Sequence, residues 1–259
     1  GKRFEAYGWH VLTVADGNDV DAVDAAITAA KAETEKPSLI AVRTHIGYGS
    51  PSKQDKAAAH GAPLGADEGK LTKDACSWPL EPEFLVPDDV REAFRAAGRR
   101  AAEAHAAWTE KYAAWRAADA ARAASWDAAW TRTLPEGWDA DLPVFTTEDK
   151  LATRAASGKV INAVAPHLPT LMGGSADLAP SNNTLIKDEA DQQPATPAGR
   201  NVRWGVREHA MAAMGTGLAL HGGVRPYVAT FFVFTDYMRP AMRLAALMGQ
   251  PVVYVLTHD

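Results

Sequence analysis

Apolar residues near the start of the chain are arranged as a strand, a helix and a second strand. The run HVLTVAD, which begins at His10, is apolar and β-branched, and the later run SLIAVRT has the same character. Between them helical spacing extends to about Lys36, and Asn18 or Asp19 can cap the helix. Residues 10–43 are therefore predicted to form one strand–helix–strand unit.

The second half of the chain alternates helices and strands. Strands that alternate with helices pair in parallel and are covered by those helices, so the predicted fold class is α/β with a parallel sheet. In chain order, the pattern predicts a helix after Thr147, a strand near 168–173, a helix through Glu208, a strand at 226–230, a helix from about Phe234 and a strand at 251–256.

A polar segment rich in glycine and proline runs from His45 to Gly69. Loops of this length in compact domains tend to be functional or mobile. Within it His60 precedes Gly61, so its ring can lie open to a ligand, although a lone loop histidine is more often simply exposed. The run from Ala15 to Asp19 is better explained as a turn with a helix cap than as a metal loop.

From Pro87 to Thr133 the composition changes to alanine, arginine and tryptophan. The pattern could provide a stacking surface for bases or sugars, but a packing seam for a linker helix is favoured. Prolines and a glycine after residue 134 end the helix and mark a second domain boundary. Six aromatic side chains fall within about 60° of one another on a helical wheel: Phe94, Trp108, Tyr112, Trp115, Trp126 and Trp130.

Overall composition restricts the classes of function. A chain of 259 residues with 47% hydrophobic residues holds one large domain or two modest ones. Its net charge of -5 argues against nucleic acid and anionic membranes as partners. Cys76 is the only cysteine, which excludes an internal disulfide. With no apolar run of about 20 residues, the chain is predicted to be a soluble cytoplasmic protein.

The segment GGSADLAPSN, at residues 173–182, carries candidate chemistry. Its two glycines let a ligand approach the backbone, and Ser175, Asp177 and Ser181 suit a phosphate or sugar hydroxyls. A strand-to-helix turn capped by the same side chains explains the segment equally well. Both interpretations stay open on the sequence alone.

Two further segments contain possible pocket residues. Glu208 precedes a helix of small apolar residues, so its carboxylate is either partly buried or simply placed at the helix N-terminus, and the second explanation is favoured. Phe231, Phe234 and Tyr237 are spaced by three and could wall a pocket for a flat heterocycle. Aromatic residues at this spacing are more often core.

Taken in order, these segments resemble the transketolase family over essentially the whole chain. The resemblance implies that residues 1–70 are the C-terminal part of a diphosphate-binding domain. Residues 71–146 correspond to a largely helical interdomain linker, and residues 147–259 to a pyrimidine-binding domain truncated at its C-terminal side. The matching motifs are FEAYGWHV, GYGSPSK, HGAPLG, GGSADLAPSN, GVREHAM, LHGG, TF with Phe234 and Tyr237, and the final THD.

The resemblance implies a thiamine-diphosphate enzyme of the pentose phosphate pathway. It would reversibly transfer a two-carbon ketol unit from a ketose phosphate to an aldose phosphate, with the cofactor as electron sink. Glu208 would hydrogen-bond the aminopyrimidine ring, which Phe231, Phe234 and Tyr237 would enclose. His60 would act on protons or hydroxyls beside the thiazolium ring.

The same resemblance assigns Arg154, Ser181 and His258 to the sugar phosphate, and Asp177 and His60 to substrate hydroxyls. The residues that hold Mg²⁺ or Ca²⁺ are expected outside this segment, so the segment alone is expected to be inactive. The expected partners are a second copy in a homodimer or complementing transketolase segments, with no nucleic acid and no membrane.

Two alternatives remain on the sequence. The cofactor could serve a related reaction, as in dihydroxyacetone synthase or deoxyxylulose-phosphate synthase, or the segment could be a catalytically silent dimerisation module. His45 stands where the family usually has an apolar or hydroxyl residue, which is a departure from its pattern.

Overall fold

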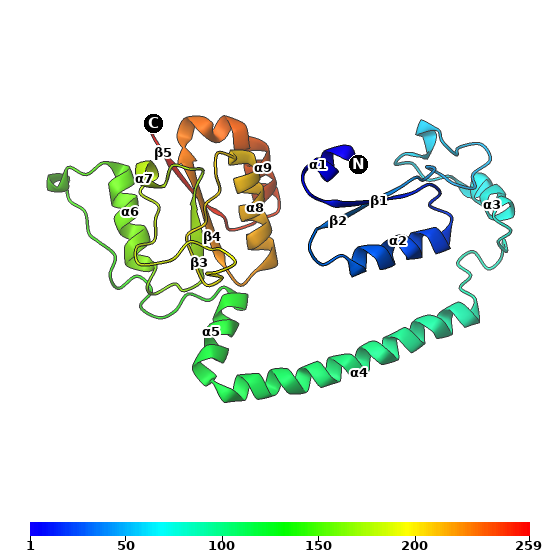
Figure 1. The fold of residues 1–259 in the computed structure, drawn as a ribbon, viewed down its shortest axis with the longest axis horizontal. Coiled ribbons are helices and arrows are strands. Elements are labelled where there is room, and N and C mark those ends of the chain that lie inside the picture. Colours follow the sequence, from blue (N-terminus) through cyan, green and yellow to red (C-terminus); the bar gives the residue numbers. More distant parts are fainter. The chain divides into compact units, whose positions relative to one another are not determined.

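Parallel pairing joins the strands in both parts of the chain, as the alternation of helices and strands predicts (Figure 1). The computed structural model describes all residues from 1 to 259. They divide into a first unit, residues 1–101, and a second unit, residues 102–259. None of the helices is long and apolar enough to cross a membrane. The predicted α/β fold class is confirmed.

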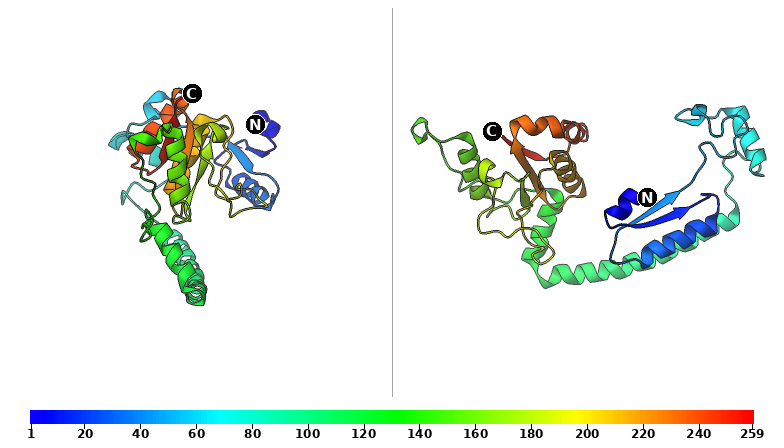
Figure 2. Two further views of the ribbon diagram at one scale, coloured as in Figure 1. Left: turned by 90° about the vertical axis from the view of Figure 1, so that its left-hand side faces the viewer. Right: turned by 45° about the horizontal axis from the view of Figure 1, so that its top comes forward.

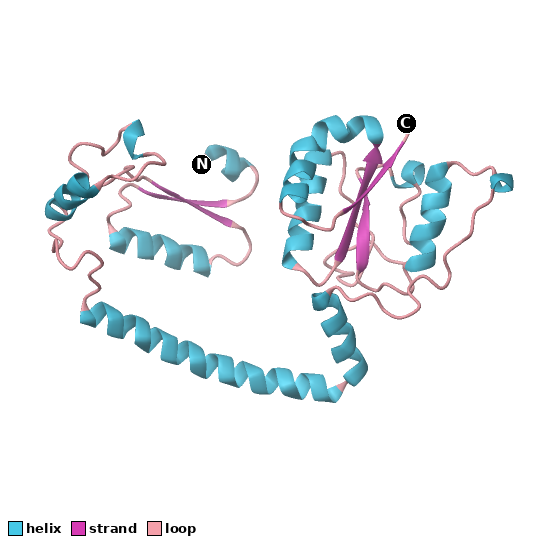
Figure 3. Ribbon diagram, turned by 180° about the vertical axis from the view of Figure 1, so that it is seen from behind, coloured by secondary structure: helices cyan, strands magenta, loops and turns pink.

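The first unit contains the predicted strand–helix–strand motif. Strand β1 (His10–Val14) pairs in parallel with β2 (Ser38–Val42), and α2 (Val20–Ala32) packs against both strands (Figure 3). Of the two predicted caps the structure uses Asp19, whose carboxylate accepts a hydrogen bond from Ala22 N at 3.0 Å.

Helix α2 ends at Ala32, four residues before the predicted end at Lys36. Glu33 is already extended, with φ −79° and ψ 118°, and its carboxylate accepts hydrogen bonds from the backbone of Glu35 and Lys36. Pro37 also disfavours helical geometry at the residue before it. A local hydrogen-bonded turn therefore replaces the last helical turn.

Three shorter helical segments complete the first unit. They are α1 (Lys2–Ala6), the 3₁₀ turn η1 (Ala57–Ala59) and α3 (Ala66–Ala75). The predicted loop is wrong for its last four residues, which already belong to α3. Asp67 and Glu68 lie in the first turn of α3, where acidic side chains stabilise a helix N-terminus.

The predicted linker helix is interrupted. Helix α4 (Asp88–Ala118) is followed by α5 (Ala120–Thr131), with extended backbone at Asp119. The Asp119 carboxylate accepts a hydrogen bond from Arg122 N at 2.9 Å and so caps α5. Residues that cap helices compete with helix continuation, which the wheel pattern alone does not reveal.

The aromatic stripe forms a seam of contacting rings in the second unit, in which Trp108, Trp126 and Trp130 each stay more than 40% exposed. Arg116 clamps the seam through two bonds to Asp127, at 2.6 and 2.7 Å. Phe94 does not join it and is 77% exposed. The other five rings contact one another in series, with centroids 4.9 to 5.8 Å apart: Trp108, Tyr112, Trp115, Trp126 and Trp130.

The second unit has a three-stranded parallel sheet between two helical layers (Figures 1 and 2). The strands are β3 (Leu171–Ser175), β4 (Arg225–Phe231) and β5 (Val253–Thr257), with β4 in the centre. One face carries α8 (Glu208–His221) and α9 (Thr235–Leu247), and the other carries α6 (Thr153–Val164) and α7 (Ala179–Asn182). The 3₁₀ turns η2 (Thr147–Asp149) and η3 (Phe232–Phe234) precede α6 and α9.

Several boundaries in this unit differ from the prediction, and β5, for example, begins two residues later than expected. Strand β3 begins three residues later than expected, because Leu168 still donates its N–H to Val164 O at the end of α6. Helix α8 begins at Glu208, where the pattern predicts a helix that continues through this residue. The carboxylate therefore lies at a helix N-terminus.

Each face of the sheet has its own core. Val228 packs with Met211 and Met238 beneath α8 and α9. On the opposite face Tyr227 packs with Ile161 of α6, and its hydroxyl donates a hydrogen bond to the Thr184 carbonyl at 2.7 Å. Side chains alternate between faces along β4, so adjacent residues serve different helical layers.

The space beside the two glycines of β3 is filled by other residues of the chain. A Cβ on Gly173 would lie 2.7 Å from the Tyr227 ring, and one on Gly174 would lie 2.2 Å from the Val202 carbonyl oxygen. Gly173 also exchanges backbone hydrogen bonds with the segment 200–202. The interpretation that these glycines admit a ligand is therefore wrong.

Arg200 ties the end of α6 to the start of β3. Its Nη1 donates to the carbonyls of Ala165 and Leu168, each at 2.9 Å, and its Nη2 donates to Glu189 at 2.7 Å. The hydrogen bond from Arg200 also lowers the pKa of the Glu189 carboxyl group. Removal of the guanidinium would leave partly buried acceptors without a donor.

We expect Arg200→Met to lower the free energy of unfolding by about 2–4 kcal/mol, because it leaves these acceptors unpaired. The matched control is Arg203→Met, which removes only an exposed ion pair with Asp191 and should cost less than about 1 kcal/mol. Urea unfolding followed by circular dichroism measures both. Equal losses for the two variants would contradict this account.

Helix α8 approaches β4 closely at a glycine. A Cβ on Gly215 would lie 2.9 Å from Val228, whereas one on Gly217 would meet nothing within 4 Å. We expect Gly215→Ala to destabilise the second unit by about 1–3 kcal/mol through overpacking. Gly217→Ala should stabilise it by about 0.5–1 kcal/mol because alanine favours the helix. Thermal unfolding of the two variants tests the opposite signs.

Candidate functional site

The carboxyl edge of the second sheet gathers several candidate residues. The strands β3, β4 and β5 end at Ser175, Phe231 and Thr257, and parallel pairing brings these ends to one edge. Helix α8 precedes β4 in the chain, so its first residue, Glu208, lies at this edge too. In open α/β sheets this edge is where ligands bind.

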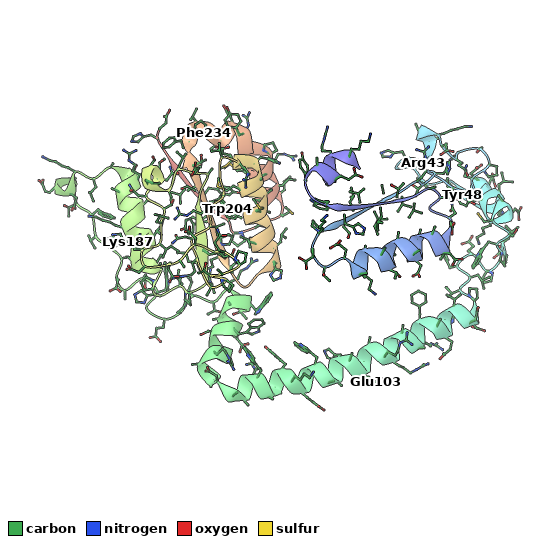
Figure 4. All side chains as sticks on the ribbon, viewed as in Figure 1. Arg43, Tyr48, Glu103, Lys187, Trp204 and Phe234 are labelled. Atoms are coloured by element: carbon green, nitrogen blue, oxygen red, sulfur yellow. The ribbon has the colours of Figure 1, made fainter.

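A cavity of about 550 Å³ opens here. The segment after β3, the start of α8 and the start of α9 each contribute to its wall. It brings together three of the predicted site residues, Asp177, Glu208 and Tyr237, with a fourth, Phe234, which Figure 4 labels. The remaining lining residues are Ala176, Leu178 and Val206.

Glu208 is the buried acid of the cavity. It is only 8% exposed, and no group of the chain donates a hydrogen bond to its carboxylate. Its position at the first residue of α8 is electrostatically favourable for a negative charge. Because no donor of the chain occupies the carboxylate and it lines the cavity, it is available to a donor outside the chain. Both explanations offered from the sequence therefore describe Glu208, which is the first residue of α8 and is also buried.

The three aromatic residues form a short series along the edge. The ring centroids of Phe231 and Phe234 are 5.9 Å apart, and those of Phe234 and Tyr237 are 6.0 Å apart. Phe234 and Tyr237 line the cavity, whereas Phe231 contacts Phe234 from the end of β4. Tyr237 is 65% exposed, so the favoured expectation that all three rings are core is wrong for this residue.

Asp177 lies in a turn that favours few residue types. Its φ is 58°, and its N–H donates to Ser175 O at 2.9 Å. Aspartate tolerates left-handed backbone better than most residues, and backbone strain tends to concentrate at functional sites. The exposed carboxylate lines the same cavity as Glu208.

The two serines of the GGSADLAPSN segment have different surroundings. Ser175 is buried, and its hydroxyl contacts the Thr184 hydroxyl at 2.6 Å, so it is already paired and unsuited to bind phosphate. Ser181 lies half-buried on α7, and its hydroxyl makes no hydrogen bond within the chain. The interpretation that serine or aspartate caps the helix is wrong, because Leu178 occupies the N-cap position of α7 and no side chain caps it. Ser181 stays free of hydrogen bonds within the chain.

Arg154 and His258 come from the neighbouring elements. Arg154 lies in the first turn of α6 and pairs with no acid of the chain. His258 follows β5 directly and is exposed, with Nδ1 2.8 Å from the Asp259 carbonyl oxygen. Helix α7, which carries Ser181, packs against both α6 and β5. The elements that carry these three residues are therefore neighbours.

His60 belongs to the first unit. It follows η1, is exposed, and makes no side-chain hydrogen bond within the chain. The same loop contains His45, which stands where the family usually has an apolar or hydroxyl residue. Its Nδ1 lies 2.9 Å from the Asp55 carboxylate, and Asp55 has left-handed backbone with φ 58°.

Glu68 on α3 holds the start of the same loop. Its carboxylate accepts hydrogen bonds from the Ser50 hydroxyl and from both the N–H and the hydroxyl of Ser52. These donors lower the pKa of Glu68 to about 2, so the carboxylate stays charged at neutral pH. The sequence pattern does not single out Glu68, because an acidic residue early in a helix is common whatever its function.

No three histidine, cysteine or acidic side chains lie close enough together to hold a metal ion. The suspected turn at Ala15–Asp19 is a turn, since Asp16 accepts hydrogen bonds from the backbone and side chain of Asn18. Those bonds lower the pKa of Asp16. The structure thus agrees with the turn-and-cap interpretation of this segment.

Comparison with known protein families gives two matches that together span most of the chain. Residues 1–135 match the family described as transketolase, thiamine diphosphate binding domain. Residues 149–259 match the family described as transketolase, pyrimidine binding domain. The predicted boundaries at residues 70 and 146 stay a prediction.

Individual relatives agree with these matches. A transketolase from Halalkalibacterium halodurans is 52% identical over 257 residues, which are 99% of this chain and 38% of the relative. The solved transketolase from Leishmania mexicana is 39% identical, with a TM-score of 0.90 over all of this chain and 38% of its own. A Pichia stipitis transketolase solved with sedoheptulose 7-phosphate gives 39% identity and a TM-score of 0.87. The chain spans well under half the length of these relatives.

Proposed function

The chain belongs to the transketolase family, and on this premise we propose that its protein transfers a two-carbon ketol unit between sugar phosphates. The donor is a ketose phosphate, the acceptor is an aldose phosphate, and thiamine diphosphate is the cofactor. The observation that carries the proposal is Glu208, a residue only 8% exposed whose carboxylate has no donor within the chain and lines a cavity walled by aromatic rings.

The cavity fits one half of the proposed cofactor. Phe234 and Tyr237 offer ring faces to a flat heterocycle, and Glu208 offers an acceptor to a ring nitrogen. When bound, thiamine diphosphate supplies an electron sink for cleavage of the carbon–carbon bond next to the ketose carbonyl. Glu208 holds the heterocycle in place and stabilises a proton on its nitrogen. Since no metal-ligand group is present, we propose that residues outside this chain bind Mg²⁺ or Ca²⁺.

The substrate residues have complementary chemistry. Arg154 presents a planar, unpaired guanidinium suited to phosphate, and Ser181 and His258 add directed hydrogen bonds. Asp177 faces the cavity and suits a sugar hydroxyl. The sugar phosphate bound by the Pichia stipitis transketolase supports this substrate class. His60 is proposed to act from the first unit on protons or hydroxyls near the reacting carbons.

We also propose that the protein works as a homodimer in the cytoplasm. Large apolar side chains stay exposed around the cavity and along α9, and such patches mark interaction surfaces. The exposed free thiol of Cys76 suits a reducing compartment. The exposed residues that support a dimer are Val206, Phe232, Val233, Leu244 and Leu247.

The test uses the native-length protein, meaning the protein at the length its cell produces. We expect Glu208→Gln to lower thiamine-diphosphate-dependent ketol transfer by at least about 100-fold, because the amide has the same shape but cannot hold the charge. The matched control is Glu103→Gln on α4, an exposed position that should leave turnover unchanged. A Glu208→Gln variant with full turnover would overturn the proposal.

A chain limited to residues 1–259 is expected to show no ketol transfer by itself, because it offers no metal-ligand group to anchor a diphosphate. Turnover measured with a ketose phosphate, an aldose phosphate, thiamine diphosphate and Mg²⁺ tests this. The native-length protein under the same conditions is the positive control. Measurable transfer by residues 1–259 alone would contradict the prediction.

A further inference from the structure

A buried asparagine links two of the elements that carry proposed substrate residues. Asn182, the last residue of α7, is fully buried, and its Nδ2 donates to the Thr257 hydroxyl at 2.6 Å. Thr257 is the last residue of β5. This bond joins positions 75 residues apart in the chain.

The other end of the Asn182 amide has no partner. Its Oδ1 is buried and accepts no hydrogen bond. Folded proteins pair the large majority of buried polar atoms, because an unpaired acceptor loses its hydration without compensation. An apolar side chain of similar size would avoid this loss. A polar residue at position 182 is therefore best explained by the hydrogen bond that its Nδ2 donates to Thr257.

The residues next to Asn182 and Thr257 in the chain are two of the proposed substrate residues. Ser181 directly precedes Asn182, and His258 directly follows Thr257. Neither side chain makes a hydrogen bond to another side chain, so the position of its backbone largely fixes where it lies. The bond between the buried pair therefore sets the spacing between a hydroxyl and an imidazole at the sheet edge.

Other bonds fix the rest of the loop but not this spacing. The hydroxyls of Ser175 and Thr184 close the loop at its base, and Tyr227 holds the Thr184 carbonyl. These contacts bind the segment after α7 to β3 and β4. The bond from Asn182 to Thr257 is the hydrogen bond that joins α7 to β5.

We propose that Asn182 is a positioning residue for the phosphate end of the substrate. Through Thr257 it holds Ser181 and His258 at the distance that lets both contact one phosphate group. This inference rests on the proposed function, since it concerns the same substrate. It assigns no contact between Asn182 and the substrate itself.

The experiment compares Asn182→Leu and Thr257→Val in the native-length protein. Each variant keeps side-chain volume and removes one partner of the bond. The matched control is Thr230→Val, a buried threonine one strand away whose hydroxyl has no partner to lose. KM and kcat are measured with a phosphorylated ketose donor and with its unphosphorylated analogue.

We expect both variants to raise KM about tenfold for the phosphorylated donor, as loss of one well-placed hydrogen bond would. KM for the unphosphorylated donor and kcat for both should stay within about twofold of the parent and of Thr230→Val. The double variant should be no worse than either single one, because both remove the same bond. If Asn182→Leu does not fold, Thr257→Val carries the test.

Equal changes in KM for both donors, additive effects in the double variant, or no change at all would overturn the positioning role. Absence of ketol transfer in the unmodified native-length protein would instead overturn the proposed function. A readout independent of turnover separates the two: inorganic phosphate titrated against the imidazole NMR signals of His258. Both variants should weaken this response, and an unchanged response would also overturn the inference.

Discussion

Parallel pairing of β3, β4 and β5 is the constraint on which the candidate site depends. Because the strands run in one direction, the residues that follow each of them must emerge at a single edge. The helices that precede the strands run back the other way, so their first residues reach the same edge. Glu208, Asp177 and His258 are far apart in the chain, yet strand pairing and the packing of α8 on β4 bring their segments together. The fold creates this edge, and the side chains at it then determine which ligand can bind there.

Local patterns in the sequence predicted much of this framework, and non-local contacts account for most of the errors. Asp19 was among the predicted caps, since a cap depends on the next few residues only. The role of Gly173 was not predictable, because the Tyr227 ring that fills its space comes from another strand. The role of Asn182 was not predictable for the same reason, since its hydrogen-bond partner Thr257 lies 75 residues away in the chain. The cavity around Glu208 could be placed only by resemblance.

Glu208 lies where a ligand can reach an acceptor that the chain leaves without a donor. It is the first residue of α8, is only 8% exposed and lines the cavity. A carboxylate in this position gains a hydrogen bond from a ligand that supplies a donor. The close approach of α8 to β4 at Gly215 keeps the helix, and so the acid, at a fixed depth. Packing of α8 at Gly215 thus helps to fix the position of the acid at the start of the helix.

The two candidate regions are each organised by side chains of their own unit. In the first unit Glu68 binds Ser50 and Ser52 and so fixes the loop that leads to His60. In the second unit Asn182 joins α7 to β5 in the same manner, through one polar side chain. Neither arrangement needs the other unit to form. Preorganised groups bind a ligand with less loss of conformational entropy, so each unit prepares its own polar groups in advance.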